Sequence, residues 1–192
     1  MRLIHIVPVL LALACTPLHA QNLVINGELD ESLIGWVNSS DTEMTAVWSP
    51  ADSNGSLESG SMRVTNLSPG ASNGVVASQC VPVNSGQSYT YGGKVRIPSG
   101  AVQDITNQAV MSLRWYSGPD CTTPNGGSIT AGGSPQNFDQ WVSQTATATA
   151  RSGARSVEVR TLLSKFPAGG SFIAHFDDII LTTPSIFQNG FD

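Results

Sequence analysis

The sequence is poor in charged residues, in histidine and in helical periodicity, and each shortage excludes a class of protein. Only 12% of its 192 residues are charged, and 14 acidic residues face 9 basic ones. A nucleic-acid partner or an anionic membrane surface favours an excess of Lys and Arg, so neither partner is expected. No window of about 11 residues repeats apolar side chains at helical spacing, so helices are not expected either.

Long apolar runs are absent except at the N-terminus, where residues 3–15 follow Arg2. A basic start, an apolar centre and a small residue at Ala20 are typical of a secretory signal peptide spanning residues 1–20. The run is short for a bilayer, and no later segment approaches about 20 apolar residues, so no transmembrane segment is expected. We predict a secreted protein, extracellular or periplasmic. The alternatives are a lipoprotein anchored through Cys15 and an N-terminal core helix.

Cysteine is scarce as well, with three residues in the chain. Cys15 leaves with the signal peptide or carries the lipid, so Cys80 and Cys121 remain as an even pair in an oxidising compartment. We predict a disulfide between them, which closes a loop of ~40 residues and contributes roughly 4 kcal/mol in the chain-entropy model. Two separate buried thiols are the alternative.

The mature chain does contain many β-branched segments separated by turn residues. Such alternation favours strands, and the Gly-, Pro-, Asn- and Ser-rich clusters between them favour turns. The predicted strands are Asn22–Asn26, Met44–Trp48, Ser61–Asn66, Gly74–Val83, Ser88–Ile97, Ala109–Ser117, Gln140–Ala148, Arg155–Leu163 and Ser171–Thr182. About nine short strands predict an all-β, two-sheet antiparallel β-sandwich of jelly-roll type. This domain spans residues 21–184, with a surface loop at 122–136 and a C-terminal tail at 185–192.

Period-two alternation assigns side chains to the faces of these strands. The outward-facing polar side chains of three strands are Lys94, Arg96, Arg114, Tyr116, Glu158 and Arg160. If the three strands are neighbours in one sheet, they form a polar platform around an aromatic ring. An aromatic plane with a few fixed polar groups suits a sugar, and the Lys and Arg excess hints at an acidic one. A solvated sheet face is the alternative.

The four tryptophans divide between core and surface. Trp36, Trp115 and Trp141 lie at positions that predict core packing. Trp48 lies at the edge of a polar loop and is a second candidate plane for a sugar ring. The alternative for Trp48 is packing against the core.

Catalytic groups are few. His175 is the single histidine left after signal removal, so a Ser-His-Asp triad or a zinc site lacks partners. Asp177 and Asp178 are successive strand residues, so their carboxylates are expected to diverge rather than to form the paired acids of a glycosidase. We therefore predict no enzymatic activity.

Three segments together resemble a known family. They are the asparagine-glycine opening with its acid in Asn22–Asp30 and the glycine-tryptophan of Ile34–Trp36, the late tryptophan strand within Gln140–Thr149, and the paired aspartates of Phe176–Leu181. The pattern resembles bacterial carbohydrate-binding modules of the cellulose- and xylan-binding, galactose-binding-like jelly-roll type. The resemblance covers most of the mature domain and is more specific for fold than for function.

The resemblance implies a protein that recognises a polysaccharide or cell-surface glycan. Together with the signal peptide and the lack of catalytic groups, it leads us to expect a secreted, non-catalytic protein, and we expect a monomer. It also implies a structural calcium, with Asp30 at the position of the N-terminal acid and Asp177 or Asp178 at that of the last-strand acid. The family acid at the first position is glutamate, so Asp30 has a shorter reach. The alternative functions are a structural or adhesive sandwich that binds a protein partner, and a glycan-active hydrolase or lyase.

Overall fold

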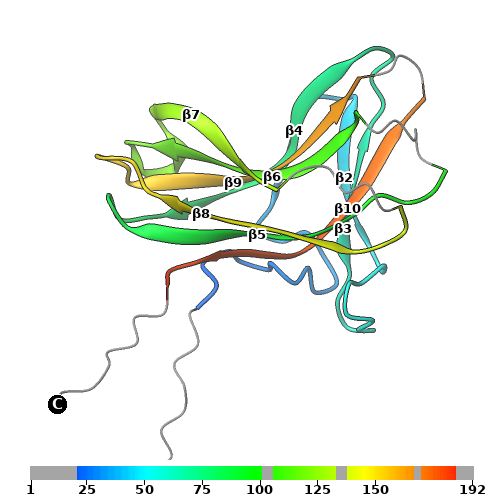
Figure 1. The fold of residues 1–192 in the computed structure, drawn as a ribbon, viewed down its shortest axis with the longest axis horizontal. Helices are drawn as coiled ribbons and strands as arrows, with labels where there is room; N and C mark the ends of the chain where they lie inside the picture. Colours follow the sequence, from blue (N-terminus) through cyan, green and yellow to red (C-terminus); the bar gives the residue numbers. More distant parts are fainter. Residues whose placement is uncertain (1–20, 101–105, 133–137, 167–169, 185–192) are drawn as a thin grey trace, which may run out of the picture.

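The fold is a sandwich of two antiparallel five-stranded sheets, seen as two layers in Figure 1. The computed structural model describes residues 21–100, 106–132, 138–166 and 170–184. Its elements are β1 (Val37–Asn38), β2 (Met44–Ser49), β3 (Ser61–Asn66), β4 (Ser72–Pro82), β5 (Ser88–Arg96), β6 (Gln108–Tyr116), the 3-10 turn η1 (Pro119–Cys121), β7 (Pro124–Ala131), β8 (Val142–Thr149), β9 (Ser156–Lys165) and β10 (Phe172–Thr182). The predicted all-β sandwich is confirmed.

Sheet I has the strand order β1-β4-β9-β6-β7, and sheet II has the order β2-β3-β10-β5-β8. The central strands, β9 and β10, therefore come from the last third of the chain. Sequence neighbours such as β5 and β6 lie in different sheets, as in a jelly roll. No helix in the described part of the chain is long and apolar enough to span a membrane.

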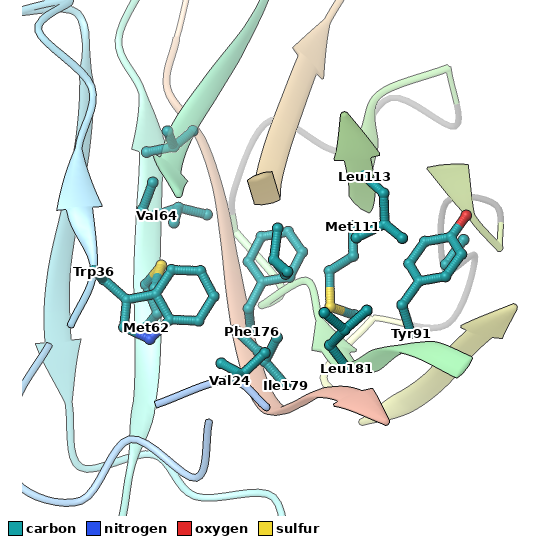
Figure 2. Close-up of a cluster of buried hydrophobic side chains, with 14 of the residues drawn as sticks. Val24, Trp36, Met62, Val64, Tyr91, Met111, Leu113, Phe176, Ile179 and Leu181 are labelled. Carbon is teal, nitrogen blue, oxygen red and sulfur yellow. The ribbon is translucent and has the colours of Figure 1, made fainter. Parts of the chain in front are cut away.

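The core lies between the sheets, and strict alternation along the strands builds it. In β6 the inward side chains are Ala109, Met111, Leu113 and Trp115, none more than 1% exposed. Residues of β10 such as Phe176 face them from sheet II (Figure 2). Each fully buried side chain of this size contributes about 1.5–3 kcal/mol. The face assignment predicted for β6 is thus confirmed, as is core packing for Trp36 and Trp115.

The N-terminal segment lies along the C-terminal half of β10 in sheet II and hydrogen-bonds to its backbone. Predicted as a strand at 22–26, it forms only an isolated bridge from Asn22 to Thr182, so that strand prediction is wrong. Gly27 lies so close to β10 that an added Cβ would sit 2.1 Å from the Ile179 carbonyl oxygen. The Ile179 amide in turn donates to the Gly27 carbonyl at 2.8 Å. The glycine is required because β10 leaves no room for a side chain.

Two elements were missed from the sequence. β1 is a two-residue pairing with β4, too short to carry a periodic signal. β7 lies within the segment 122–136 that was expected to be a loop, and it pairs with β6 as an edge strand. Its two glycines, Gly126 and Gly127, have low strand propensity, so the pairing partner rather than the local sequence imposes the extended conformation.

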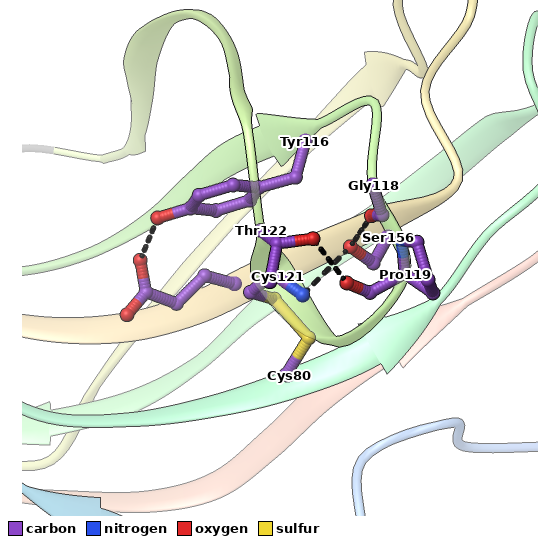
Figure 3. Close-up of a disulfide and its surroundings, with 8 residues drawn as sticks. Cys80, Tyr116, Gly118, Pro119, Cys121, Thr122 and Ser156 are labelled. Atoms are coloured by element: carbon purple, nitrogen blue, oxygen red, sulfur yellow. Dashed lines mark hydrogen bonds between the residues drawn. A yellow bond between two sulfur atoms is a disulfide. The ribbon is translucent and has the colours of Figure 1, made fainter.

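The predicted disulfide is present between Cys80 and Cys121, with sulfurs 2.06 Å apart (Figure 3). It ties β4 to the η1 turn that joins β6 and β7. The predicted signal peptide at 1–20 and the predicted tail at 185–192, and with them Cys15 and Ala20, lie outside the described residues.

Candidate functional site

The predicted six-residue platform divides between the two sheets. Arg114 and Tyr116 on β6 lie beside Glu158 and Arg160 on β9, because β6 and β9 are neighbours in sheet I. Lys94 and Arg96 belong to β5 in sheet II. The prediction of one shared platform is therefore wrong. Alternation along a strand gives the face of a side chain, but it does not give the sheet to which the strand belongs.

The sheet I cluster is a linked set of side chains on the outer face. The Tyr116 hydroxyl donates to Glu158 Oε2 at 2.8 Å (Figure 3). The Arg114 guanidinium carbon lies 5.5 Å from the centroid of the Tyr116 ring, within the range of a cation–π contact. Burial, and then the hydrogen bond to Glu158, raise the pKa of Tyr116, so its hydroxyl remains a donor. Tyr116 thus fixes a carboxylate and a guanidinium in place.

Tyr116 is not an open aromatic plane. Its side chain is only 6% exposed, so a sugar ring cannot stack on it without moving Arg114. The groups available to a ligand are the half-buried Arg114 and Glu158 and the exposed Ser128 of β7. The site therefore offers hydrogen bonds and charge rather than the stacking platform expected from the sequence.

Arg160 is the most constrained charge on this face. It is 6% exposed, and its guanidinium donates from Nε to Ser112 Oγ at 3.2 Å and from Nη2 to Ser128 Oγ. Burial lowers the pKa of Arg160, and the nearby Glu158 carboxylate opposes that shift. Two hydroxyls therefore hold this guanidinium at the floor of the face, and fixed donors of this kind are typical of polar recognition sites.

Lys94 and Arg96 occupy the outer face of sheet II. The Lys94 ammonium contacts Asp178 Oδ2 at 2.8 Å and also donates to Ser53 and Asn54. Arg96 lies 3.4 Å from a carboxylate oxygen of Asp139, in a partly exposed pair. Lys94 is thus used to hold a loop, whereas Arg96 keeps most of its donors.

The aspartates of β10 lie together rather than apart. A register shift follows Asp177, and Asp178 takes a positive φ of 48°. This β-bulge turns both carboxylates toward Ser53, whose amide donates to Asp177 Oδ2 and whose hydroxyl donates to Asp178 Oδ2. The expectation that the two side chains diverge is therefore wrong. Asp177 is fully buried, and burial raises its pKa to about 6, so no substrate reaches it as a catalytic acid.

The proposed calcium ligands show little of the oxygen cage that the ion needs. Asp177 accepts backbone N–H groups and Asp178 pairs with an ammonium, so both carboxylates already have donors. Asp30 is exposed and lines an open depression of about 220 Å³ with Asn22, Asn26 and others. Within the described ranges no three His, Cys, Asp or Glu residues are grouped to hold a metal. Calcium binding by these residues stays a prediction from the sequence.

Trp48 packs on the core, which was the alternative for this residue, whereas Trp141 does not take the core position predicted for it. The Trp48 indole packs against the core and donates to the Leu29 carbonyl at 2.8 Å, so it clamps the N-terminal loop to β2. Trp141 is half-buried, is not among the side chains packed on the core, and meets His175 edge-on at 6.3 Å between ring centroids. Core packing was therefore the wrong prediction for Trp141, which lies just before β8 and against His175 of β10.

His175 does have a serine partner, but the pair is not accessible. Its Nδ1 lies 2.9 Å from Ser61 Oγ, and Ser61 is completely buried. Burial, followed by the charges of Arg96 and Arg63, lowers the pKa of His175 to about 4, so the imidazole is neutral at physiological pH. A nucleophile that no substrate can reach does not support hydrolysis.

Comparison with known proteins shows the fold and little more. No family model matches the chain, and no curated protein matches it in sequence. Among solved structures, the C-terminal family 22 carbohydrate binding module of Clostridium thermocellum xylanase 10B is 16% identical, with a TM-score of 0.58, over 83% of this chain and 92% of that one. A family 16 carbohydrate binding module is 17% identical, with a TM-score of 0.52, over 84% of this chain and 99% of that one.

Longer proteins contain the same fold as one part. The enzymatically active domain of tailspike protein 4 of bacteriophage CBA120 is 16% identical, with a TM-score of 0.62, over 84% of this chain. This chain spans 21% of that tailspike chain, and it spans 28% of a xylanase 10B structure that joins a family 22 module to a catalytic module. The β-sandwich of carbohydrate-binding modules is therefore shared by this protein.

Proposed function

We propose that the chain is a secreted, monomeric, non-catalytic protein that recognises a polysaccharide or cell-surface glycan through the outer face of sheet I. The observation that carries the proposal is the Arg114–Tyr116–Glu158 linkage, where hydrogen bonding and a cation–π contact hold both charges in place. A preorganised set of donors and acceptors lowers the entropic cost of binding polyhydroxylated ligands.

The fold gives this proposal a context. The neighbours with the same sandwich include a family 22 module described as xylan-binding and another solved with xylohexaose in the same crystal. Their low identity carries only the fold, so the substrate class is argued from the side chains of this chain. Fixed hydroxyls and paired charges suit sugar hydroxyl groups better than they suit an apolar peptide.

The test is retention of the purified chain on a panel of immobilised polysaccharides. Glu158→Gln should weaken retention about tenfold, because it replaces a charge-assisted acceptor by a neutral one. Glu43→Gln is the matched control, since Glu43 is exposed just before β2 in the other sheet. Equal retention of both variants and wild type, or no retention on any polysaccharide, would overturn the proposal.

The two competing functions give different readouts in the same preparation. An adhesive sandwich that binds a protein partner predicts cell attachment that free oligosaccharide does not compete. A hydrolase or lyase predicts new reducing or unsaturated ends after incubation with the panel. Attachment competed by free sugar, with no new chain ends, is the result expected from the proposed function.

A further inference from the structure

A second group of side chains, on the opposite face of the molecule, has no place in the site on sheet I. Arg63 on β3 pairs in register with His175 on β10, and His175 pairs in register with Arg96 on β5. Their strand neighbours, such as Met62, Val64, Ala174, Phe176 and Val95, are all buried in the core. Arg63, His175 and Arg96 therefore form one row across the outer face of sheet II.

We propose that this row, together with Trp141, is a second glycan site, and that it takes the carboxylate of an acidic sugar such as a uronate. The proposal goes beyond the site on sheet I and does not depend on it. Neighbouring strands lie about 4.8 Å apart, so the two arginines leave the sheet roughly 10 Å from each other, with His175 between them. Arginine side chains are long enough to reach a single anion from that separation.

The positive charge of the row is only partly compensated, because Arg96 donates to the carbonyl and the carboxylate of Asp139. Arg63 makes no hydrogen bond or ion pair with any side chain or backbone group that the structure describes. Arg96 has one carboxylate neighbour, Asp139, whose side chain is 45% exposed at 3.4 Å. Lys94, by contrast, is neutralised by Asp178 in the next row. Two guanidinium groups that share one weakly paired carboxylate leave an excess of positive charge, which favours an anionic ligand. A carboxylate suits this position because guanidinium binds it through paired hydrogen bonds.

An aromatic ring stands beside these charges. The Trp141 indole lies against His175 at an interplanar angle of 80° and does not pack on the core. His175 Nδ1 contacts Ser61, which fixes the imidazole on which the indole rests. The half-buried indole leaves part of its ring open to solvent beside His175, and an apolar sugar face is a common partner for such a ring.

The geometry of a uronate fits this combination. Its carboxylate is attached to the pyranose ring, so the anion and the apolar C–H face lie within one sugar unit. The carboxylate is expected to accept from the ends of the Arg63 and Arg96 side chains, beside the indole that lies on His175, and the sugar ring is expected on the solvent side of Trp141. A neutral sugar could stack on the indole, but it would supply no negative charge to pair with the two arginines.

The test is calorimetric titration of the full chain with an oligogalacturonate, and with the methyl ester of the same oligosaccharide. The acid should bind and the ester should bind at least about tenfold more weakly, because esterification removes the charge that the arginines recognise. Arg63→Gln and Trp141→Ala should each weaken binding of the acid about tenfold. Arg155→Gln, which removes an exposed arginine next to sheet I, is the matched control and should leave binding unchanged.

Three outcomes would overturn the proposal: no binding of the acid, equal binding of acid and ester, or an Arg63→Gln variant that binds like wild type. Circular dichroism of each variant separates loss of binding from loss of fold. Glu158→Gln keeps the two sites distinguishable, because it should weaken retention on the sheet I polysaccharide and leave the uronate titration intact. If Glu158→Gln alone abolishes uronate binding, the anion binds on sheet I and the second site is refuted.

Discussion

Replacing both cysteines of the disulfide by serine should destabilise the domain by about 2 to 4 kcal/mol. Cys80 and Cys121 are 41 residues apart, and the chain-entropy model gives a loop of that length roughly 4 kcal/mol. The turn they hold is strained, because Asp120 and Cys121 take positive φ values of 54° and 55°. Left-handed residues cost about 1–3 kcal/mol each, so a released turn that relaxes recovers part of the loss.

Guanidinium unfolding of wild type, of the Cys80→Ser/Cys121→Ser variant and of reduced wild type measures this loss. Reduced wild type and the double variant should agree within about 1 kcal/mol, since both remove the same cross-link. A loss below about 1 kcal/mol in both would refute the reasoning that this loop closure stabilises the fold.

The same cross-link has a functional consequence. The Cys121 amide donates to Ser156 Oγ, and the Ser156 hydroxyl donates to the Gly118 carbonyl (Figure 3). Ser156 is the register partner of Tyr116. Release of the turn should therefore weaken polysaccharide retention by the sheet I face as well as stability, and unchanged retention would separate the two roles.

Three further predictions concern stability, each measured by thermal or denaturant unfolding. In the folded state the pKa of His175 is about 4, below its usual 6.5, so its contribution to the free energy of unfolding is present above pH 6.5 and is lost as pH falls toward 4. The pKa of Asp177 is raised to about 6, so its contribution to the free energy of unfolding is present below pH 3.8 and is lost as pH rises through 6. His175→Gln should expose the Asp177 effect as a fall of up to about 3 kcal/mol between pH 4 and 6, and a rise would contradict it. Gly27→Ala should cost about 1–3 kcal/mol, because its Cβ would lie 2.1 Å from the Ile179 carbonyl oxygen, and a neutral result would mean that β10 can shift. Trp48→Phe should cost about 1–2 kcal/mol by leaving the Leu29 carbonyl without its donor, and sugar binding that falls while stability does not would return Trp48 to the ligand site.

The alternation of apolar and polar residues was enough to predict the strands and which of their side chains face the core. The inward set of β6, ending at Trp115, and the outward position of Arg114 follow from period two alone, because one face must be buried. The pairing of β6 with β9 instead of β5 does not follow, since jelly-roll topology brings distant segments together. That is why Tyr116 and Glu158 meet while Arg96 lies on the other sheet.

Like the strand pairing, the β-bulge in β10 could not be predicted from the sequence. Period two predicts that Asp177 and Asp178 diverge, and only the shifted register and the positive φ of Asp178 reverse that. Trp141 was misjudged for a related reason, because a lone tryptophan before a strand carries no signal of its face. Arg63 could have been found, since it lies between the apolar Met62 and Val64 in a predicted strand.

The most direct test of the account is an NMR titration with the oligosaccharide of whichever polysaccharide retains the chain. The account predicts that backbone shifts change on the outer face of sheet I, around Arg114, Ser128 and Glu158, with the inward-facing residues of β6 unaffected. Shift changes confined to the loops, or spread over sheet II alone, would contradict the claim that this face recognises the glycan.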